Sequence, residues 1–563
     1  MTRNDIQKLF QEPRSLVDLL PYAEYAEGVF IQVDGSLGRI WEIEPLKVGC
    51  LGEEALGEIV SSLSGFIAHL PAEYNFQFLL CSDGAIESVL KAYEKAGIAD
   101  ENAIVARIMA EKMRHMLNSK DGFFKGETFA PRRLRVFFTA RYIPVEKPFS
   151  FIEQWRSFLL KEERMPLKIA RQMDVQKSDF LRVCASIEGQ WQSLRLGAVA
   201  LNDDDMVALL YGILNPKRSN IIAAREHSGE PLRDQVLYNA PQAEGPGFVF
   251  DGYHTRVVSL KELPSRTVAG MFSADTADSG GECLLDILNN MMVVINCTVP
   301  EQTKALERLK FQKTFAFIQR ASSSGNVSEE AVHQKEELSA LITETFKSGK
   351  AIVYARAHIV LFSASAEEAD RACDALLSAL HRFGAEGLKE EIIAPSLFLT
   401  CLPLNFDHTL ESVIRRTKRL LSDNFADMLP VYGAFRSTPT PAAMYLNRRG
   451  EPVFVDLFDS ATNPHAVIIG ASGAGKSFLT NDLIYQNYRL GSYFFVLDKG
   501  HSYRKTCEVL NGQYVSFEMD KPLRINPFYR KPTAENQAFL VEMLAMMASG
   551  GDERDRLGRE ERG

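Results

Sequence analysis

The sequence predicts a multidomain α/β protein, in which mixed α+β N-terminal and middle regions precede the first part of a P-loop nucleotide-binding domain. Three observations support this prediction. The chain has 563 residues, which is too long for one hydrophobic core at about 150 residues per domain. Strand-like and helix-like segments follow each other in mixed order through the first three quarters of the chain. Beyond them, short apolar strands alternate with helical segments, which is typical of a parallel sheet.

The composition is that of an ordinary globular protein and excludes several other classes. Hydrophobic residues make up 46% and charged residues 24% of the chain, so it is neither disordered nor fibrous. A net charge of -9 disfavours DNA binding over the whole surface but leaves open a local basic groove. The eight cysteines are scattered singly, which favours reduced, mostly buried thiols in a cytoplasmic protein. We expect neither a signal peptide nor a membrane-spanning helix, because long apolar runs are missing.

The N-terminal region, residues 1–225, is expected to be an α+β domain. Asp34-Gly35 lies between two strand-like runs, and this dipeptide favours the positive φ of a tight hairpin turn. Trp41 belongs to the same hairpin and is expected in the core. The other expected elements are a helix over 53–70, a strand from Tyr74, helices over 86–120, a strand over 133–143 and mainly helices over 149–214.

The middle region, residues 226–425, is expected to be a second mixed unit. Residues 227–252 are rich in Gly, Pro and Asn, which predicts a long surface excursion. The other expected elements are a strand around Val293, a helix over 301–319 and a strand over 352–362 with a helix on each side. Closely spaced prolines place the next boundary near 423–440, so the last domain covers 426–549, before a charged tail at 550–563.

Basic residues gather at two places outside the P-loop region. The first group is expected on one helix, where a solvated helix face is a better explanation than contact with DNA, acidic lipid or a neighbouring subunit. The second group precedes a strand and is expected to supply edge-strand charges. The first group is Arg415, Arg416, Lys418 and Arg419, and the second is Arg132, Arg133 and Arg135.

A phosphate-binding P-loop carries the chemistry of this sequence. An apolar run ends at Gly470, and the pattern Gly-x-x-x-x-Gly-Lys-Ser then leads into a helix-like segment. The glycines let successive backbone N–H groups face one anion, and the following helix N-terminus adds positive charge. Lys476 is expected to reach the β and γ phosphates of ATP, and the Ser477 hydroxyl to bind Mg²⁺. The predicted nucleotide-binding residues here are Gly470, Ala471, Ser472, Gly473, Ala474, Gly475, Lys476 and Ser477.

Asp498 ends a second apolar run, and its role admits several interpretations. A Walker B acid would hold Mg²⁺ through water, but only one helix separates Asp498 from the P-loop and no Glu follows it. As the end of a second strand, Asp498 would lie beside the nucleotide at the carboxyl edge of the sheet. As a helix cap or turn residue it would be structural. The last two interpretations are equally supported, so Asp498 is a candidate nucleotide-binding residue, while the catalytic acid is not identified.

Five segments carry a resemblance to a known family. They are DGSLGRIWEIEPL (34–46), LNRRGEPVFVDLF (446–458), GASGAGKSF (470–478), VLDKGHSY (496–503) and LRINPF (523–528). These segments are similar to their counterparts in the conjugative type IV secretion ATPases, and within them in the TraC family of F-type pilus assembly proteins. The resemblance extends over residues 15–549.

The resemblance implies a cytoplasmic motor with a RecA-like C-terminal ATPase domain. Its N-terminal domain would dock on inner-membrane components of a type IV secretion channel, which implies a peripheral location at the inner membrane. It also implies a hexamer whose ATP hydrolysis energises pilus assembly and DNA or protein transfer, with any DNA contact indirect. The family continues through a Walker B Asp-Glu pair, a sensor Gln and an intersubunit Arg. None has a matching position here, so we expect an incomplete RecA-like domain in a protein that is truncated at its C-terminus.

Two other functions remain as alternatives. A nucleotide-binding scaffold would dock on the channel without hydrolysing ATP, as the unidentified catalytic acid indicates. A DNA-pumping coupling protein would resemble this family in its motor, but such proteins usually carry N-terminal membrane helices, which are not expected here. ATP turnover separates the first alternative from a motor, and stimulation of turnover by DNA separates the second.

Overall fold

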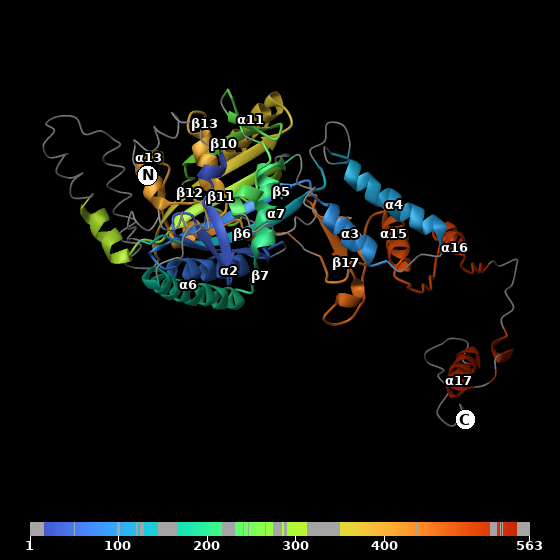
Figure 1. The fold of residues 1–563 in the computed structure, drawn as a ribbon. Helices are drawn as coiled ribbons and strands as arrows, with labels where there is room; N and C mark the ends of the chain where they lie inside the picture. Colours follow the sequence, from blue (N-terminus) through green and yellow to red (C-terminus); the bar gives the residue numbers. More distant parts are fainter. Residues whose placement is uncertain are drawn as a thin grey trace, which may run out of the picture.

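The computed structural model describes residues 16–548 with several gaps. The residues left out within this range are 50, 98–101, 120–121, 124–128, 145–166, 217–230, 240, 246, 265, 274–283, 287–289, 312–349, 435–436, 518–525, 530 and 532. Figure 1 shows a large body around one sheet and a smaller group of elements beside it, in which light-blue and orange-red segments lie together. The expected helix before residue 352 and the charged tail at 550–563 lie outside the described residues.

Thirteen strands form one antiparallel sheet among the described residues of the large body. Strands on both sides of residue 225 take part, because β5 pairs with β11. The order along the sheet is β1 (Tyr22–Ala26), β2 (Val29–Gln32), β3 (Leu37–Ile43), β6 (Arg133–Tyr142), β5 (Tyr74–Asp83), β11 (Asn290–Thr298), β12 (Ile352–Ser363), β10 (Tyr253–Glu262), β9 (Gly247–Phe250) and β8 (Gln242–Glu244). Three further strands pair with members of this row, namely β7 (Ala198–Ala200) with β3, β13 (Glu386–Glu390) with β10, and β14 (Lys418–Leu421) with β12.

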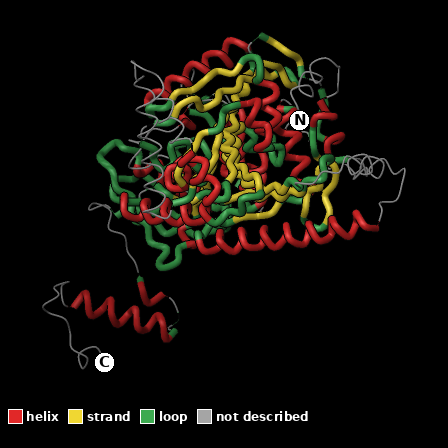
Figure 2. Tube along the Cα trace, turned by 90° about the vertical axis from the view of Figure 1, so that its left-hand side faces the viewer, coloured by secondary structure: helices red, strands yellow, loops and turns green. Residues whose placement is uncertain are grey.

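Helices cover both faces of the sheet, so its central strands are apolar on both sides (Figure 2). In β5, Phe76 and Phe78 join one core and Leu79 joins the other, as the alternation of side chains along a strand requires. The first core includes residues of α2 (Glu53–Ala68), α6 (Leu167–Ser193), α11 (Ala366–Arg382) and α14 (Ser422–Met428). The second includes residues of α7 (Asp203–Leu214), α8 (Leu232–Gln235) and α12 (Ala394–Cys401).

The first hairpin and its tryptophan are confirmed. Gly35 has φ +78° in the turn between β2 and β3, which pair antiparallel. Trp41 is 1% exposed, and its ring meets that of Trp191 edge-on at a centroid distance of 5.1 Å. Such a pair adds stability beyond its buried area, which helps to fix α6 on the sheet. Cysteines are also buried as expected at five described positions, namely Cys81, Cys184, Cys297, Cys373 and Cys401.

The predicted surface excursion over residues 227–252 is wrong where this segment is described. It contains β8, β9 and α8, and both Leu232 and Val236 are buried in the second core. The glycines were the misleading signal. A Cβ on Gly247 would lie 2.3 Å from the Thr255 carbonyl oxygen, so glycine here permits a close approach of β9 and β10.

The arginines before residue 136 are not edge-strand charges, so that prediction is wrong. β6 lies between β3 and β5 in the sheet. Arg135 tolerates this position because its Nε and NH2 donate to the Glu42 carboxylate on β3 at 2.9 and 2.6 Å. Arg132 donates from NH1 to the Leu285 carbonyl oxygen at 2.5 Å.

The predicted basic helix near residue 415 is also wrong. Helix α13 (Glu411–Ile414) ends before the arginines, and Arg415 has φ +51°. Lys418 and Arg419 belong to β14, which pairs with β12. Arg416 makes two bonds to the Glu390 carboxylate, at 2.7 and 3.1 Å, so a buried acid on β13 accounts for one of these charges.

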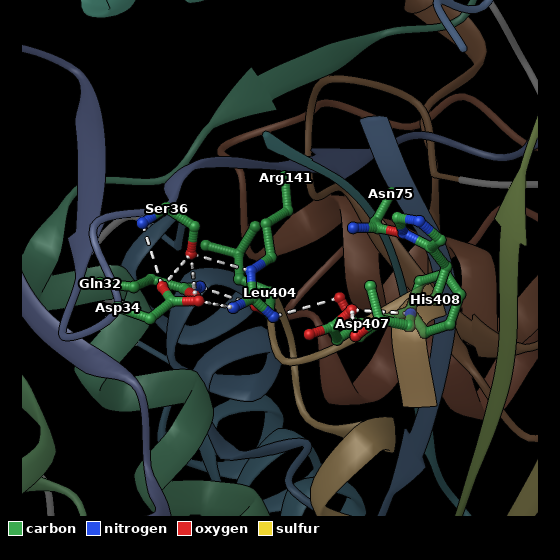
Figure 3. Close-up of polar contacts among 10 residues, drawn as sticks. Gln32, Asp34, Ser36, Asn75, Arg141, Leu404, Asp407 and His408 are labelled. Atoms are coloured by element: carbon green, nitrogen blue, oxygen red, sulfur yellow. Dashed lines mark hydrogen bonds and ion pairs between the residues drawn. The ribbon is translucent and has the colours of Figure 1, made fainter. Parts of the chain in front are cut away.

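A buried polar network ties the first hairpin to the loop at residues 402–408 (Figure 3). Arg141 on β6 donates from Nε to Ser36 Oγ at 3.0 Å, from NH1 to the Phe406 carbonyl oxygen at 3.1 Å, and from NH2 to Asp34 Oδ2 at 3.1 Å. Gln32 donates to the Leu404 carbonyl oxygen at 2.7 Å. Side-chain hydrogen bonds therefore join the first hairpin to a loop that lies more than 300 residues later in the sequence.

The burial of His358 on β12 makes the free energy of unfolding depend on pH. His358 is fully buried, with Nδ1 at 2.9 Å from Ser259 Oγ on β10. Burial, followed by the positive charges of Arg356 and Arg416, lowers the pKa of His358 from 6.5 to about 3. The unfolded protein therefore binds a proton below about pH 6.5 that the folded protein does not bind. The contribution of the neutral His358 to stability is therefore full above about pH 6.5. It falls by about 1.4 kcal/mol per pH unit as the pH decreases from there towards the pKa of His358 in the folded protein.

We expect His358→Asn to remove this part of the acid sensitivity. Thermal unfolding of the variant and of the parent, compared at pH 7.5 and 5.5, measures it as a smaller loss of midpoint temperature in the variant. His381→Asn is the matched control, because His381 is exposed on α11. An equal pH dependence of the parent and His358→Asn would contradict the buried neutral imidazole.

Candidate functional site

The P-loop belongs to the smaller group of elements beside the large sheet (Figure 1). This group contains α3 (Glu87–Lys95), α4 (Ala103–Asn118), β16 (Ala443–Leu446), β17 (Pro452–Val455), α15 (Lys476–Tyr488) and α16 (Arg504–Val509). The helices expected over 86–120 are thus confirmed where they are described. Helix α17 (Ala534–Ala548) lies apart from the group in the view of Figure 1.

The backbone of the P-loop has the conformation that its glycines predict. Gly473 has φ +80°, and Gly475 has φ +89° at the N-cap of α15, both in the left-handed region that side chains disfavour. The first hydrogen bond within α15 runs from Leu479 N to Gly475 O at 2.9 Å. The N–H groups in the first turn of α15 have no acceptor inside the helix, and they form the positive end of the helix dipole.

Lys476 places a positive charge against the same loop. Its Nζ donates to the carbonyl oxygens of Gly470 and Ala471 at 2.7 and 2.8 Å. A Cβ on Gly470 would lie 3.3 Å from Ala474 Cβ and 3.4 Å from Lys476 Cγ, so a side chain there would crowd the lysine. Ser477 follows directly and is exposed. A loop of this kind typically binds the phosphates of a nucleotide, and the role of the Ser477 hydroxyl towards Mg²⁺ stays a prediction.

The apolar runs around the P-loop are not paired as strands among the described residues. The parallel sheet that the sequence predicts for this region is therefore not observed there. Residues 466–469, 493–497 and 514–517 have no strand assignment. A parallel strand is stable when neighbours pair with it and helices cover both faces, and neither condition holds here among the described residues. The most exposed side chains of these runs are Tyr493 at 102%, Phe495 at 91%, Ile469 at 89%, Leu497 at 87% and Val467 at 83% exposure.

The described side-chain contact of Asp498 is with the turn before α16 and not with the P-loop. Its Oδ2 accepts a hydrogen bond from Tyr503 N at 3.2 Å, just before α16. This contact fits the structural interpretation of Asp498 as a turn residue. Its role in nucleotide binding stays a prediction.

A set of residues on the far half of α15 and at its C-cap was not predicted from the sequence. Asp482, Gln486 and Arg489 follow each other at helical spacing and contact α3, α4 or the segment before β16. Their types gave no signal, because polar residues on a helix are usually solvated. Only the spacing of four and then three residues marks them as one stripe.

In the part of the chain that the structure describes, no helix is both long and apolar enough to cross a membrane. Within the same residues, three or more His, Cys, Asp or Glu side chains nowhere gather in a way that could hold a metal ion.

The fold and the P-loop together agree with the matches of this chain to two family models. Residues 444–555 match the family model described as the TraG P-loop domain, which contains the loop and α15. Residues 16–406, more than half of the chain, match the family model described as TraC protein. The chain belongs to the TraC protein family.

Relatives with curated names are components of type IV secretion systems. Protein TraC of Escherichia coli (strain K12) is 31% identical over 171 residues, which are 28% of this chain and 19% of that protein. Type IV secretion system protein virB4 of Brucella abortus biovar 1 (strain 9-941) is 31% identical over 118 residues, or 20% of this chain and 14% of that protein. Type IV secretion system protein PtlC of Bordetella pertussis (strain Tohama I / ATCC BAA-589 / NCTC 13251) is 25% identical over 270 residues, 43% of this chain and 31% of that protein. The matched segments cover less than a third of each relative.

Proposed function

We propose that this chain is a nucleotide-binding motor subunit of a conjugative type IV secretion system. In this proposal, ATP hydrolysis energises pilus assembly and the transfer of DNA or protein. The observation that carries it is the P-loop at the start of α15, with Lys476 against the loop, in a protein whose residues 16–406 match the TraC family. A location at the cytoplasmic face of the inner membrane, a hexameric state and docking on inner-membrane channel components are parts of the same proposal.

Each P-loop residue has a defined task in binding Mg²⁺ and ATP. The glycines keep the backbone open so that N–H groups from the loop and the first turn of α15 donate to phosphate oxygens. Lys476 exchanges its bonds to the loop carbonyls for bonds to the β and γ phosphates. The Ser477 hydroxyl is one ligand of Mg²⁺, which neutralises charge on the phosphates when it is bound.

A scaffold that binds nucleotide without turnover is the second candidate. The observation in its favour is Asp498, whose carboxylate is engaged by the Tyr503 N–H in a turn. Without a carboxylate that orients the attacking water, bound ATP is hydrolysed slowly. Phosphate release by the purified protein separates the two candidates, and its stimulation by single- or double-stranded DNA would instead favour a DNA-pumping coupling protein.

The binding step is tested with Lys476→Ala. A charge-assisted hydrogen bond contributes about 1.5–3 kcal/mol, so we expect the affinity for a fluorescent ATP analogue with Mg²⁺ to fall about 10- to 100-fold. Lys531→Ala is the control, because Lys531 is exposed and lies far along the sequence from the P-loop. Equal affinities of the parent and Lys476→Ala would overturn the assignment of the site.

A further inference from the structure

Helix α15 is held by the N-terminal part of the protein, although it carries the P-loop at its own N-terminus. The stripe of Asp482, Gln486 and Arg489 lies on one side of α15. Lys112 on α4 donates from Nζ to Asp482 Oδ2 at 3.1 Å and to Oδ1 at 3.3 Å. Burial lowers the pKa of Lys112, and Asp482 opposes this shift. The ion pair is therefore partly withdrawn from water, where its geometry matters more than at an exposed site.

Gln486 is the centre of the junction between α15, α3, α4 and β16, because it is fully buried and its described side-chain bonds cross or support this junction. Its Oε1 accepts from Tyr93 Oη on α3 and from Met444 N on β16, both at 2.7 Å. Its Nε2 donates to Asp482 Oδ2 at 2.7 Å. One amide group thus connects α3, the β16–β17 hairpin and the carboxylate that pairs with Lys112.

Arg489 closes the same side of the helix. It donates from NH1 to the Tyr93 carbonyl oxygen at 2.6 Å and from NH2 to the Pro441 carbonyl oxygen at 2.7 Å. Its guanidinium lies 3.9 Å from the centroid of the Tyr93 ring. An apolar cluster fills the space between these polar contacts, with Leu90, Tyr93, Val105, Met109, Met116 and Met444 buried in it and Tyr485 and Tyr488 of α15 packed against it.

Helices α3 and α4 are themselves continuous with the centre of the large sheet. They lie between β5 and β6 in the sequence, and these two strands pair with each other up to Asp83 and Arg133. A shift of β5 or β6 must therefore move the base of the α3–α4 pair. Because α15 is a rigid helix, the pair acts on the P-loop through Asp482, which lies about 9 Å along the helix axis from Lys476.

We propose that the α3–α4 pair is a positioning element for the P-loop helix, so that nucleotide affinity depends on the state of the N-terminal sheet. Lys112 and Tyr93 act through Asp482 and Gln486, and none of the four belongs to the P-loop at residues 470–477. The coupling is reciprocal, so that nucleotide binding also stabilises the junction with the N-terminal sheet. This proposal rests on nucleotide binding at the P-loop, which is the proposed function of the protein.

The test reverses the charge of Lys112 and then restores the pair in the swapped order. We expect Lys112→Asp to weaken binding of the fluorescent ATP analogue with Mg²⁺ by at least about fivefold. Hydrogen exchange at the backbone N–H groups of residues 476–480 should become faster in the same variant. The double variant Lys112→Asp with Asp482→Lys should recover both properties. Arg114→Asp is the matched control, because Arg114 lies on the same helix and pairs with Glu111 at an exposed site.

The two readouts keep failure of this proposal apart from failure of the proposed function. If the parent protein does not bind the analogue, the proposed function fails, while hydrogen exchange at residues 476–480 still tests the junction. Unchanged affinity and unchanged exchange in Lys112→Asp would overturn the positioning role. So would a double variant that stays as weak as the single one, because the effect of Lys112→Asp would then be unrelated to its pairing with Asp482.

Discussion

Gly450→Ala is expected to loosen the β16–β17 hairpin from the large body. Gly450 has φ +81° in the turn of this hairpin, and its carbonyl oxygen accepts a hydrogen bond from Arg132 N at 2.9 Å. A Cβ at this position would lie 2.0 Å from the Ala130 carbonyl oxygen. The left-handed backbone costs a side chain about 1–3 kcal/mol, and overpacking against a fixed backbone atom adds about 1–3 kcal/mol. Chemical unfolding combined with hydrogen exchange over residues 443–455 measures the loss.

Gly252→Ala separates the two causes. Gly252 has φ +82°, but a Cβ there would meet nothing within 4 Å. The control therefore shows the cost of the left-handed backbone alone. If both variants lose the same stability, the close approach to Ala130 is unimportant and the hairpin is not fixed at this point. If Gly450→Ala also speeds hydrogen exchange in α15, the loss has spread through Met444, whose N–H bonds to Gln486.

Arg141→Met is expected to be the second most damaging change. Arg141 is 5% exposed and makes bonds to Ser36, Asp34 and the carbonyl oxygen of Phe406. Removing it leaves the partly buried Asp34 carboxylate and the Phe406 carbonyl without this donor. Loss of one partner from a buried charged network costs about 3–5 kcal/mol. The fluorescence of the buried Trp41 and Trp191 reports unfolding of the same body in a urea titration.

An exposed ion pair on α6 provides the matched control for this prediction. Arg182 lies 3.1 Å from Asp179, and the two side chains are 78% and 61% exposed. Arg182→Met should therefore change the free energy of unfolding by no more than about 0.5 kcal/mol. An Arg141→Met variant as stable as Arg182→Met would show that the network in Figure 3 does not hold the first hairpin to the loop at residues 402–408.

Local chemistry made several elements of the large body predictable. The Asp34-Gly35 turn depends on the backbone freedom of one residue, and the apolar runs of β5, β11 and β12 depend on burial on both faces. The pairing of these strands was not predictable, because it joins residues far apart in the sequence. The prediction for residues 227–252 was wrong for a different reason. Gly247 allows tight strand packing, and composition alone cannot distinguish such a glycine from one in a loop.

The candidate site also has a part that was predictable from the sequence and a part that was not. The P-loop was predictable because phosphate binding needs glycines, a lysine and a helix start in one short stretch, and the helix begins at Lys476 as expected. The contacts that hold the other half of α15 were not predictable. Lys112 and Asp482 are 370 residues apart, and either one alone is an ordinary charged residue on a helix. Asp498 remains a prediction, because a carboxylate after an apolar run serves a turn as readily as a nucleotide.

The insertion of α3 and α4 between two paired strands has a consequence for synthesis. The apolar side of the pair, with Leu90, Tyr93, Val105, Met109 and Met116, is complete once α4 has left the ribosome. Its partners on β16 and α15 follow only after roughly 330 more residues, which takes on the order of 15–65 s at about 5–20 residues per second. During this interval the apolar side of the pair lacks these partners, while β6 and the later strands of the sheet are themselves still being synthesised. The order of the elements therefore leaves the apolar side of α3 and α4 uncovered for longer than a contact between neighbouring segments would.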